Sequence, residues 1–496
     1  MNTPFTSLAL MVAIGLPGAA AATQTTPPKP GPARQVTTPK VVATTLDNGL
    51  RVLVAQRADE PLVTAELVVL SGSEVDPAKL PGAAEMTATL LTRGTASRSA
   101  PQIAADAAAL GGAIRASAGW DETDIGITVT TPKLDEALAL LADVTLHPTF
   151  AKAELERARR EALDSLRIAW GSPGALSRMV ARRAVFGGGD YGHPGDGTPD
   201  SLKALGRDDL LRLHSAWYRP DNAVLIFAGD IAPKDAFALA SKAFGEWRKP
   251  EAALPQAQAD TGTPVAAKVV AVDLDHAGQA GVVVAGKAIP RDADDYYAGL
   301  VANAVLGGSY SARLNEEVRI KRGLSYGAGS HLAALRHGGW VVATAQTKNP
   351  SAAQVVDLML KQVASLAGNP PDAGELKARK ATLVGGFGRS LETTRGLASQ
   401  VAERAVYGID PNTMGEFISR VEAVDSKQVQ AFANKHLGAD GMRVVVVGDA
   451  SVYGKALDKA WPKAQHIQST ALDLERADLG LKLDETKPVS APKPAG

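Results

Sequence analysis

The sequence predicts an α+β protein built from two similar domains, each a sheet with helices on one face. Three observations lead to this prediction. Strand patterns and helix patterns are mixed along the chain without strict alternation. A stretch rich in Pro and Ala, residues 251–264, reads as a linker near the centre. The halves on either side, residues 41–250 and 265–468, carry similar segments in the same order, which indicates internal duplication.

The elements of the first half follow from local patterns. Asn48-Gly49 separates two short apolar runs, and Asn-Gly is the strongest short hairpin signal. Residues 62–70 form an apolar strand, and residues 125–129 alternate apolar and polar side chains, as in a half-buried strand. Apolar residues then recur at helical spacing between residues 134 and 166.

Two pairs of segments support the duplication. The strand-like runs at residues 223–230 and 444–449 both end in Gly-Asp, and each follows a helix with a polar face. The helical segments at residues 154–160 and 375–380 are also alike. The alternative is coincidence among common strand and helix patterns, but the shared order favours two homologous domains.

The N-terminus has the features of a secretory signal. Residues 8–16 are apolar and residues 19–22 are all Ala, so residues 1–22 are predicted to be a signal peptide. A Pro-rich linker follows at residues 23–40, and residues 469–496 are predicted to form a disordered tail. No later run is long enough to span a membrane, so we expect a periplasmic or secreted protein without stable membrane insertion.

The composition excludes several classes of function. Lys and Arg number 53, and Asp and Glu also number 53, so the formal net charge of the 496 residues is zero. A general nucleic-acid binder needs a basic field, so we expect no nucleic-acid partner. The absence of cysteine removes disulfides, thiolate metal sites, cysteine nucleophiles and iron–sulfur clusters.

The eight histidines offer little for a metal site. No two of them are three or four residues apart, so no helix presents two imidazoles on one face. His331 and His337 are close enough in sequence to meet across a hairpin, and this alternative stays open.

Gly323-Leu-Ser-Tyr-Gly327 matches the pattern of a serine-hydrolase nucleophile, G-x-S-x-G, but its context is wrong. That mechanism needs a strand, a sharp turn and then a helix, so that the Ser is exposed above the sheet. Here residues 312–322 are predicted to be a helix, Gly323 its C-terminal cap, and Leu324 the start of a strand. Ser325 is therefore not expected to be a nucleophile.

The informative segment runs from Gly82 to Thr95. Its sequence is Gly-Ala-Ala-Glu-Met-Thr-Ala-Thr-Leu-Leu-Thr-Arg-Gly-Thr, and with the rest of the chain it resembles the pitrilysin/insulinase family of zinc peptidases. That family has an inverted H-x-x-E-H motif on a helix framed by Gly and Gly-Thr. The resemblance places Glu85 at the first His, Ala88 at the Glu and Thr89 at the second His.

The resemblance also implies that the third zinc ligand is missing. In the family this ligand is a Glu on a later helix, and the corresponding residue here is Ser165. A catalytic zinc needs three protein ligands and an open position for water. We therefore expect no zinc in this chain and no peptidase activity from the chain alone.

Further matches extend the resemblance over about residues 42–468. They are the opening hairpin, the loop at residues 192–198, the segment 218–230 and the segment 307–326. In the last segment the family has an Arg, and seven residues later a Tyr, that reach across a closed clamshell to the substrate. These correspond to Arg319 and Tyr326, whose guanidinium and phenol can both donate hydrogen bonds to a peptide carbonyl.

The resemblance implies a two-domain protein that forms half of a clamshell and works with a homologous zinc-bearing subunit. Peptide substrates would add as a strand to the edge at residues 114–121, where Arg115 replaces the Asn usual in catalytic relatives. Two alternatives stay open: an inert structural or binding protein of the same fold, and an active peptidase of another class. For Arg319 and Tyr326 the alternative is a cationic helix end beside a packed Tyr.

Overall fold

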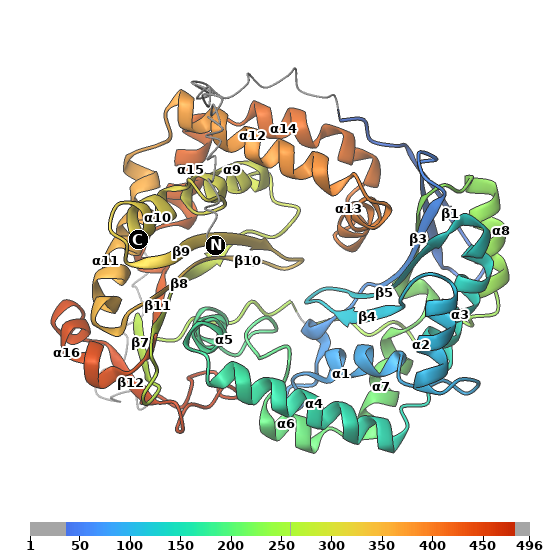
Figure 1. The fold of residues 1–496 in the computed structure, drawn as a ribbon, viewed down its shortest axis with the longest axis horizontal. Coiled ribbons are helices and arrows are strands. Elements are labelled where there is room, and N and C mark those ends of the chain that lie inside the picture. The colour runs from blue at the N-terminus through green and yellow to red at the C-terminus, as the bar shows by residue number, and fades with distance from the viewer. Residues whose placement is uncertain (1–35, 258, 482–496) are drawn as a thin grey trace, which may run out of the picture. The chain divides into compact units, whose positions relative to one another are not determined.

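Two six-stranded sheets organise the chain in the computed structural model, which describes residues 36–257 and 259–481 (Figure 1). The predicted signal peptide at residues 1–22 lies outside the described residues. The α+β fold with two similar domains is confirmed.

The first sheet has the strand order β1-β2-β6-β3-β5-β4. Only β2 and β6 are parallel, and every other neighbouring pair is antiparallel. The strands are β1 (Val41–Thr45), β2 (Arg51–Gln56), β3 (Leu62–Val69), β4 (Arg115–Ala118), β5 (Thr123–Thr130) and β6 (Ala223–Gly229). The hairpin between β1 and β2 turns at Gly49, whose φ of 95° favours glycine.

The second sheet has the order β12-β7-β11-β8-β10-β9 and repeats the first. The parallel pair β7 and β11 corresponds to β2 and β6, and β8, β10 and β9 follow it in antiparallel pairing, as in the first sheet. The outer strand differs, because β12 pairs with β7 in parallel whereas β1 pairs with β2 antiparallel. The strands are β7 (Val269–Asp273), β8 (Ala280–Ala288), β9 (Ser325–Ala334), β10 (Gly339–Thr347), β11 (Arg443–Gly448) and β12 (Gln465–Gln468). The common strand order supports the inferred duplication.

Helices supply most of the remaining structure. In the first half they are α1 (Ala83–Leu91), α2 (Ala100–Ala109), α3 (Leu134–Leu146), α4 (Lys152–Trp170), α5 (Pro173–Phe186), α6 (Pro199–Ala204), α7 (Arg207–Trp217) and α8 (Pro233–Phe244). In the second half they are α9 (Tyr296–Leu306), α10 (Arg313–Asn315), α11 (Ala352–Gly368), α12 (Ala373–Ser390), α13 (Thr394–Val406), α14 (Phe417–Ala423), α15 (Ser426–His436) and α16 (Ala450–Ala460). None of the helices in the described part of the chain is long and apolar enough to cross a membrane.

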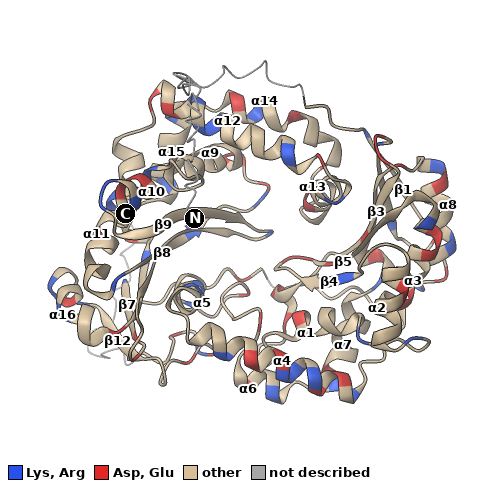
Figure 2. Cartoon of the chain, viewed as in Figure 1, with Lys and Arg blue, Asp and Glu red and all other residues tan. Residues whose placement is uncertain are grey.

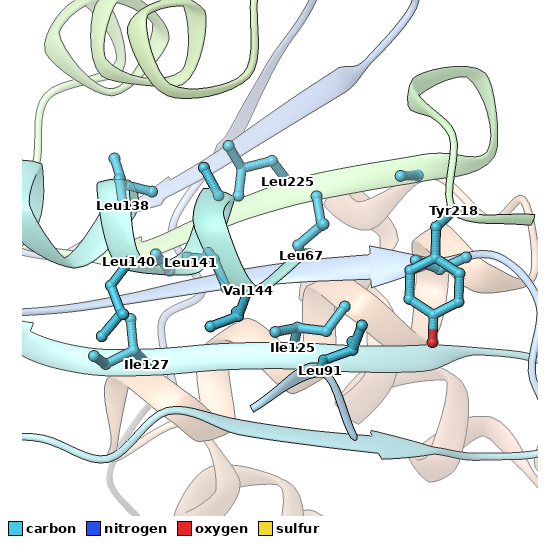
Figure 3. Packing of buried hydrophobic residues seen from close by; sticks show 14 of the residues in the cluster. Leu67, Leu91, Ile125, Ile127, Leu138, Leu140, Leu141, Val144, Tyr218 and Leu225 are labelled. Carbon is cyan, nitrogen blue, oxygen red and sulfur yellow. The ribbon is translucent and has the colours of Figure 1, made fainter. Parts of the chain in front are cut away.

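The main core of each half lies between its sheet and its own helices. Figure 3 shows Leu67, Ile125 and Leu225 of the first sheet facing Leu138 and Leu141 of α3, and all five are almost completely buried. Burying one such side chain contributes about 1.5–3 kcal/mol relative to leaving it exposed. The alternating pattern in β5 and the helical spacing in α3 therefore predicted the side chains of the two elements that meet in this core.

Each sheet is also covered on its opposite face by one helix of the other half. α5 packs against β8 and β11, and α13 packs against β3 and β6 (Figure 1). Leu176 and Val180 of α5 share a core with Val270 and Val283. The expectation of helices on one face is thus correct for each half alone, but the exchange of α5 and α13 closes the second face.

A hairpin tip also joins the halves. Arg336, between β9 and β10, donates from Nη1 to Glu74 Oε1 at 3.2 Å and from Nη2 to the Asp121 carbonyl at 2.8 Å. Its backbone N–H donates to Asp121 Oδ2 at 2.8 Å. Burial raises the pKa of Glu74 to about 8, while Arg336 opposes that rise.

The predicted disordered tail is wrong for its first part. Residues 469–481 continue from β12, and their leucines, including Leu472, Leu474 and Leu479, are buried in the core around α5. Arg183 donates from Nε to the Leu474 carbonyl at 2.9 Å. These leucines recur with no helix or strand period, so the sequence pattern did not predict an ordered segment. The Pro- and Lys-rich composition of the end favoured disorder instead.

Candidate functional site

Two neighbouring pockets contain three of the site residues that the sequence predicted, Glu85, Arg319 and Tyr326. Glu85 lines a pocket of about 330 Å³ between α1, β4 and α5, called here the α1 pocket. Arg319 and Tyr326 line a pocket of about 570 Å³ between α5 and β9, called here the Arg319 pocket. Arg178 of α5 lines both pockets, so the two predicted parts of the site adjoin.

The start of α1 is fixed by a buried carboxylate. Asp76 accepts hydrogen bonds from the backbone N–H groups of Gly82 and Ala84, both at 2.7 Å. Gly82 has a φ of 89°, and a side chain there would collide with the backbone of Gly197. Burial raises the pKa of Asp76, and His193, 3.3 Å away, lowers it. The Gly82 frame and the loop around His193 therefore meet at this helix end.

Glu85 is engaged with the edge of the first sheet. Its Oε2 accepts a hydrogen bond from the Ala118 N–H at 2.9 Å, and Thr89 donates to Oε1 at 3.3 Å. Burial raises the pKa of Glu85, and the bond from Ala118 lowers it. Glu85 thus holds β4 against α1.

The other two positions offer no acid or imidazole. Ala88 is fully buried in α1. Ser165 is exposed on α4, and its hydroxyl donates to the Glu161 carbonyl one turn earlier at 3.0 Å. α1 and α4 pack together, so the structure brings the helices into contact, but Ser165 is turned back onto its own helix.

These residues do not fit the zinc that the resemblance implies. Of the four positions only Glu85 carries a strong metal ligand, whereas catalytic zinc needs three. No group of three or more His, Asp or Glu side chains able to hold a metal ion occurs within residues 36–257 and 259–481. At these four positions the side chains offer hydrogen bonding and electrostatic interactions.

The α1 pocket also contains a stacked cation that the sequence analysis missed. The guanidinium of Arg182 lies 4.2 Å from the centre of the Trp120 ring and 4.5 Å from that of Trp340. Burial lowers the pKa of Arg182 to about 9, which leaves it charged at neutral pH. Arg178 and Arg182 are one helical turn apart on α5, which has no acidic residue (Figure 2).

Arg319 and Tyr326 are placed by an irregular helix end. The helix predicted at residues 312–322 is a short α-helical turn followed by a π-helical turn, Glu316–Ile320. Gly323 has a φ of 61°, and its N–H donates to the Arg319 carbonyl at 2.8 Å. β9 begins two residues later, which confirms the predicted cap and strand and rules out a strand–turn–helix nucleophile at Ser325.

The side chains of Arg319 and Tyr326 are both available to a ligand. Tyr326 is 88% exposed, and Tyr310 is 65% exposed. The Arg319 guanidinium lies 4.9 Å from the centre of the Tyr310 ring. The cation–π contact orients Arg319 toward the pocket that Tyr326 also lines.

The predicted substrate edge is an edge in the structure. β4 is the last strand of the first sheet, and Arg115 on it is exposed. The outward N–H of Ala118 is already bonded to Glu85. The backbone N–H and C=O groups of successive residues in a strand point to opposite sides. Those of Ala116 therefore point outward like those of Ala118, and they are the next groups able to pair with an added strand.

Arg178 and Tyr310 could be found only partly from the sequence. Tyr310 lies within the segment 307–326 that resembles the family, and this resemblance is the sequence signal for it. Arg178 carries no motif, and its role depends on α5 crossing to the second sheet.

Comparisons with known proteins find matches to both halves of the chain. The family model described as insulinase (peptidase family M16) matches residues 51–187, and the model described as peptidase M16 inactive domain matches residues 204–383. Together they cover more than half of the chain.

Individual relatives align over most of their length. A protein of Bacillus subtilis, called an uncharacterized zinc protease, is 24% identical over 79% of this chain and 94% of its own. One of Mycobacterium leprae with the same description is 27% identical over 80% of this chain and 91% of its own.

Solved structures share the fold. The crystal structure of a peptidase M16 inactive domain from Pseudomonas fluorescens superposes with a TM-score of 0.76 at 26% identity, over 82% of this chain and 98% of that one. A protease from Helicobacter pylori gives a TM-score of 0.78 at 21% identity, over 83% of this chain and all of that one.

Proposed function

The chain belongs to the insulinase family of M16 peptidases, and within that family we propose that it is a subunit without zinc. It binds peptides and positions them for a homologous partner that carries an intact H-x-x-E-H motif and the zinc. One observation carries this proposal. The Arg319 pocket is open and lined by exposed donors, while the helix α1 positions of the zinc motif hold Glu85, Ala88 and Thr89.

The partner supplies the metal chemistry in this proposal, and this chain supplies hydrogen bonds. The guanidinium of Arg319 and the hydroxyl of Tyr326 would hold the carbonyl of the bond to be cut and stabilise the charge that develops on its oxygen. Arg319 lies before the turn that Gly323 caps and Tyr326 lies after it, on β9, so this turn sets the spacing of the two groups. Donors held in place before the reaction need no reorganisation during it.

Glu85 would align the substrate and take no part in catalysis. Its bond to Ala118 fixes β4, the edge that we propose receives the peptide as an added strand. Because Ala118 N–H is occupied, pairing would use Ala116 and the carbonyl of Ala118. The apolar run at residues 8–16 supports export, so we propose that the complex works in the periplasm or outside the cell.

The proposal is tested in the complex reconstituted with its zinc-bearing homologue. Tyr326→Phe removes one hydroxyl, and Arg319→Lys keeps the charge but loses the planar fork. Removing such a donor costs about 10² to 10³ in turnover, so each variant should lower turnover by about that factor. Assembly, measured as the mass of the complex by light scattering, should not change.

Arg160→Lys is the matched control, because Arg160 is exposed on α4 and lines neither pocket. Its turnover should equal that of the unmodified complex. Full activity of both Tyr326→Phe and Arg319→Lys would refute the proposed role. The inert structural protein of the same fold would then be the better account.

A further inference from the structure

The charged residues that line the Arg319 pocket are all positive. It contains Arg178 from the first half and Arg319 from the second, and none of its lining residues in the described part of the chain is Asp or Glu. Two guanidinium groups thus face the same 570 Å³ of space with no carboxylate on its wall. Such a pocket attracts a negatively charged group.

Nearby acids are already paired with other cations. Glu317 is within 2.9 Å of Lys321 Nζ and also bonds Arg322. Glu375, beside α10, pairs with Arg313 at 2.6 Å. Within the described ranges, no ion pair involves Arg178 or Arg319, so no carboxylate there neutralises either charge.

Neutral donors surround the two cations. The hydroxyls of Tyr310 and Tyr326 are exposed on the same wall. The N-terminal part of α5 also lines the pocket, with Gly174 in its first turn and Ser177 in its second, and the N-terminal end of a helix favours negative charge. These groups reinforce the two arginines, although none of them would define a site alone.

We propose that the Arg319 pocket binds a carboxylate of the peptide at Arg178, beside the carbonyl that Arg319 holds. The carboxylate belongs either to an Asp or Glu side chain or to the C-terminus. Arg178 is then a residue that determines peptide specificity. The planar guanidinium matches the two oxygens of a carboxylate. The inference rests on the proposed function, because it names the class of peptide that this subunit presents.

The test measures peptide binding to the purified full chain, without its partner, by fluorescence anisotropy. Four labelled peptides of one length differ only in having internal Glu or Gln and a free or amidated C-terminus. The neutral peptide, with Gln and an amide, should bind about tenfold more weakly than the better of the singly charged peptides. Which of those two binds better identifies the source of the carboxylate.

Arg178→Gln should reduce this preference about three- to fivefold, and added salt should reduce it further. Arg160→Gln removes an equal charge from an exposed site outside the pocket and should leave the preference unchanged. Equal binding of the four peptides, or a preference that survives Arg178→Gln intact, would overturn the carboxylate site and leave the subunit role standing. Failure of every peptide to bind would instead contradict peptide binding itself.

Discussion

Asp124→Asn should stabilise the protein at neutral and alkaline pH. Asp124 lies on β5, its Oδ1 is buried without a hydrogen-bond partner, and it neighbours Glu66 on β3. Both carboxyls belong to the region that α13 covers, where Thr64 meets Thr394 at 2.9 Å. Burial, and then the charge of Glu66, raise the pKa of Asp124 from 3.8 to about 7.

The sign follows from proton binding. Between pH 3.8 and about 7 the folded protein holds a proton on Asp124 that the unfolded chain releases. Stability contributed by this group is therefore fully present below pH 3.8 and is lost as the pH rises toward 7. Asn cannot ionise, so the variant gains relative to the parent across this window and keeps the gain above it.

The magnitude has a ceiling of about 4 kcal/mol, at about 1.36 kcal/mol for each pKa unit. Burial raises the pKa of Glu66 to about 7 as well, so the two carboxyls share protons. The expected gain in the free energy of unfolding is therefore about 1–2 kcal/mol at pH of about 8 and close to zero at pH of about 4.

Urea unfolding followed by tryptophan fluorescence at several pH values measures this difference. All other titrating groups are common to both proteins, so their contributions cancel in the comparison. Asp59→Asn, at a side chain that is 82% exposed, should show no such pH dependence. A loss of stability at pH of about 8, or a gain that does not depend on pH, would refute the reasoning.

Three further outcomes are expected. Arg336→Gln removes the guanidinium that bonds buried Glu74, and it should lower the free energy of unfolding by about 2 kcal/mol in the same urea assay; an unchanged midpoint would show that the hairpin contact is not stabilising. Gly323→Ala should cost about 1 kcal/mol, because Ala is strained at a φ of 61°, and a neutral result would contradict the observed cap. The purified chain should contain no stoichiometric zinc by elemental analysis. The double variant Glu85→His, Thr89→His should still cleave no peptide, because the general base and the third ligand remain absent. Cleavage by that double variant would contradict this prediction.

Local patterns predicted the elements well where one face of an element meets its own domain. The Asn48-Gly49 turn, the alternation in β5 and the spacing in α3 each reflect a single buried face, and all three are confirmed. The cap at Gly323 was predictable from a different local rule, because a left-handed residue after a helix favours glycine.

Contacts between the halves were not predictable from periodicity. Leu176 on α5 reads as an ordinary amphipathic position, and nothing in its spacing says that its partners are in the second sheet. Leu474 in the tail is buried against the same helix without any periodic pattern. Arg178 becomes part of a pocket only through this exchange, so that half of the candidate site required the three-dimensional structure.

The most direct test of the central claim is peptide turnover by this chain alone, by its zinc-bearing homologue alone, and by an equimolar mixture. The account predicts no turnover from this chain, little from the homologue, and an increase of about 10² or more in the mixture, as expected when positioned donors are added to a metal site. The increase should disappear when the mixture contains Tyr326→Phe. Turnover by this chain alone that a chelator abolishes, or no gain on mixing, would contradict the account.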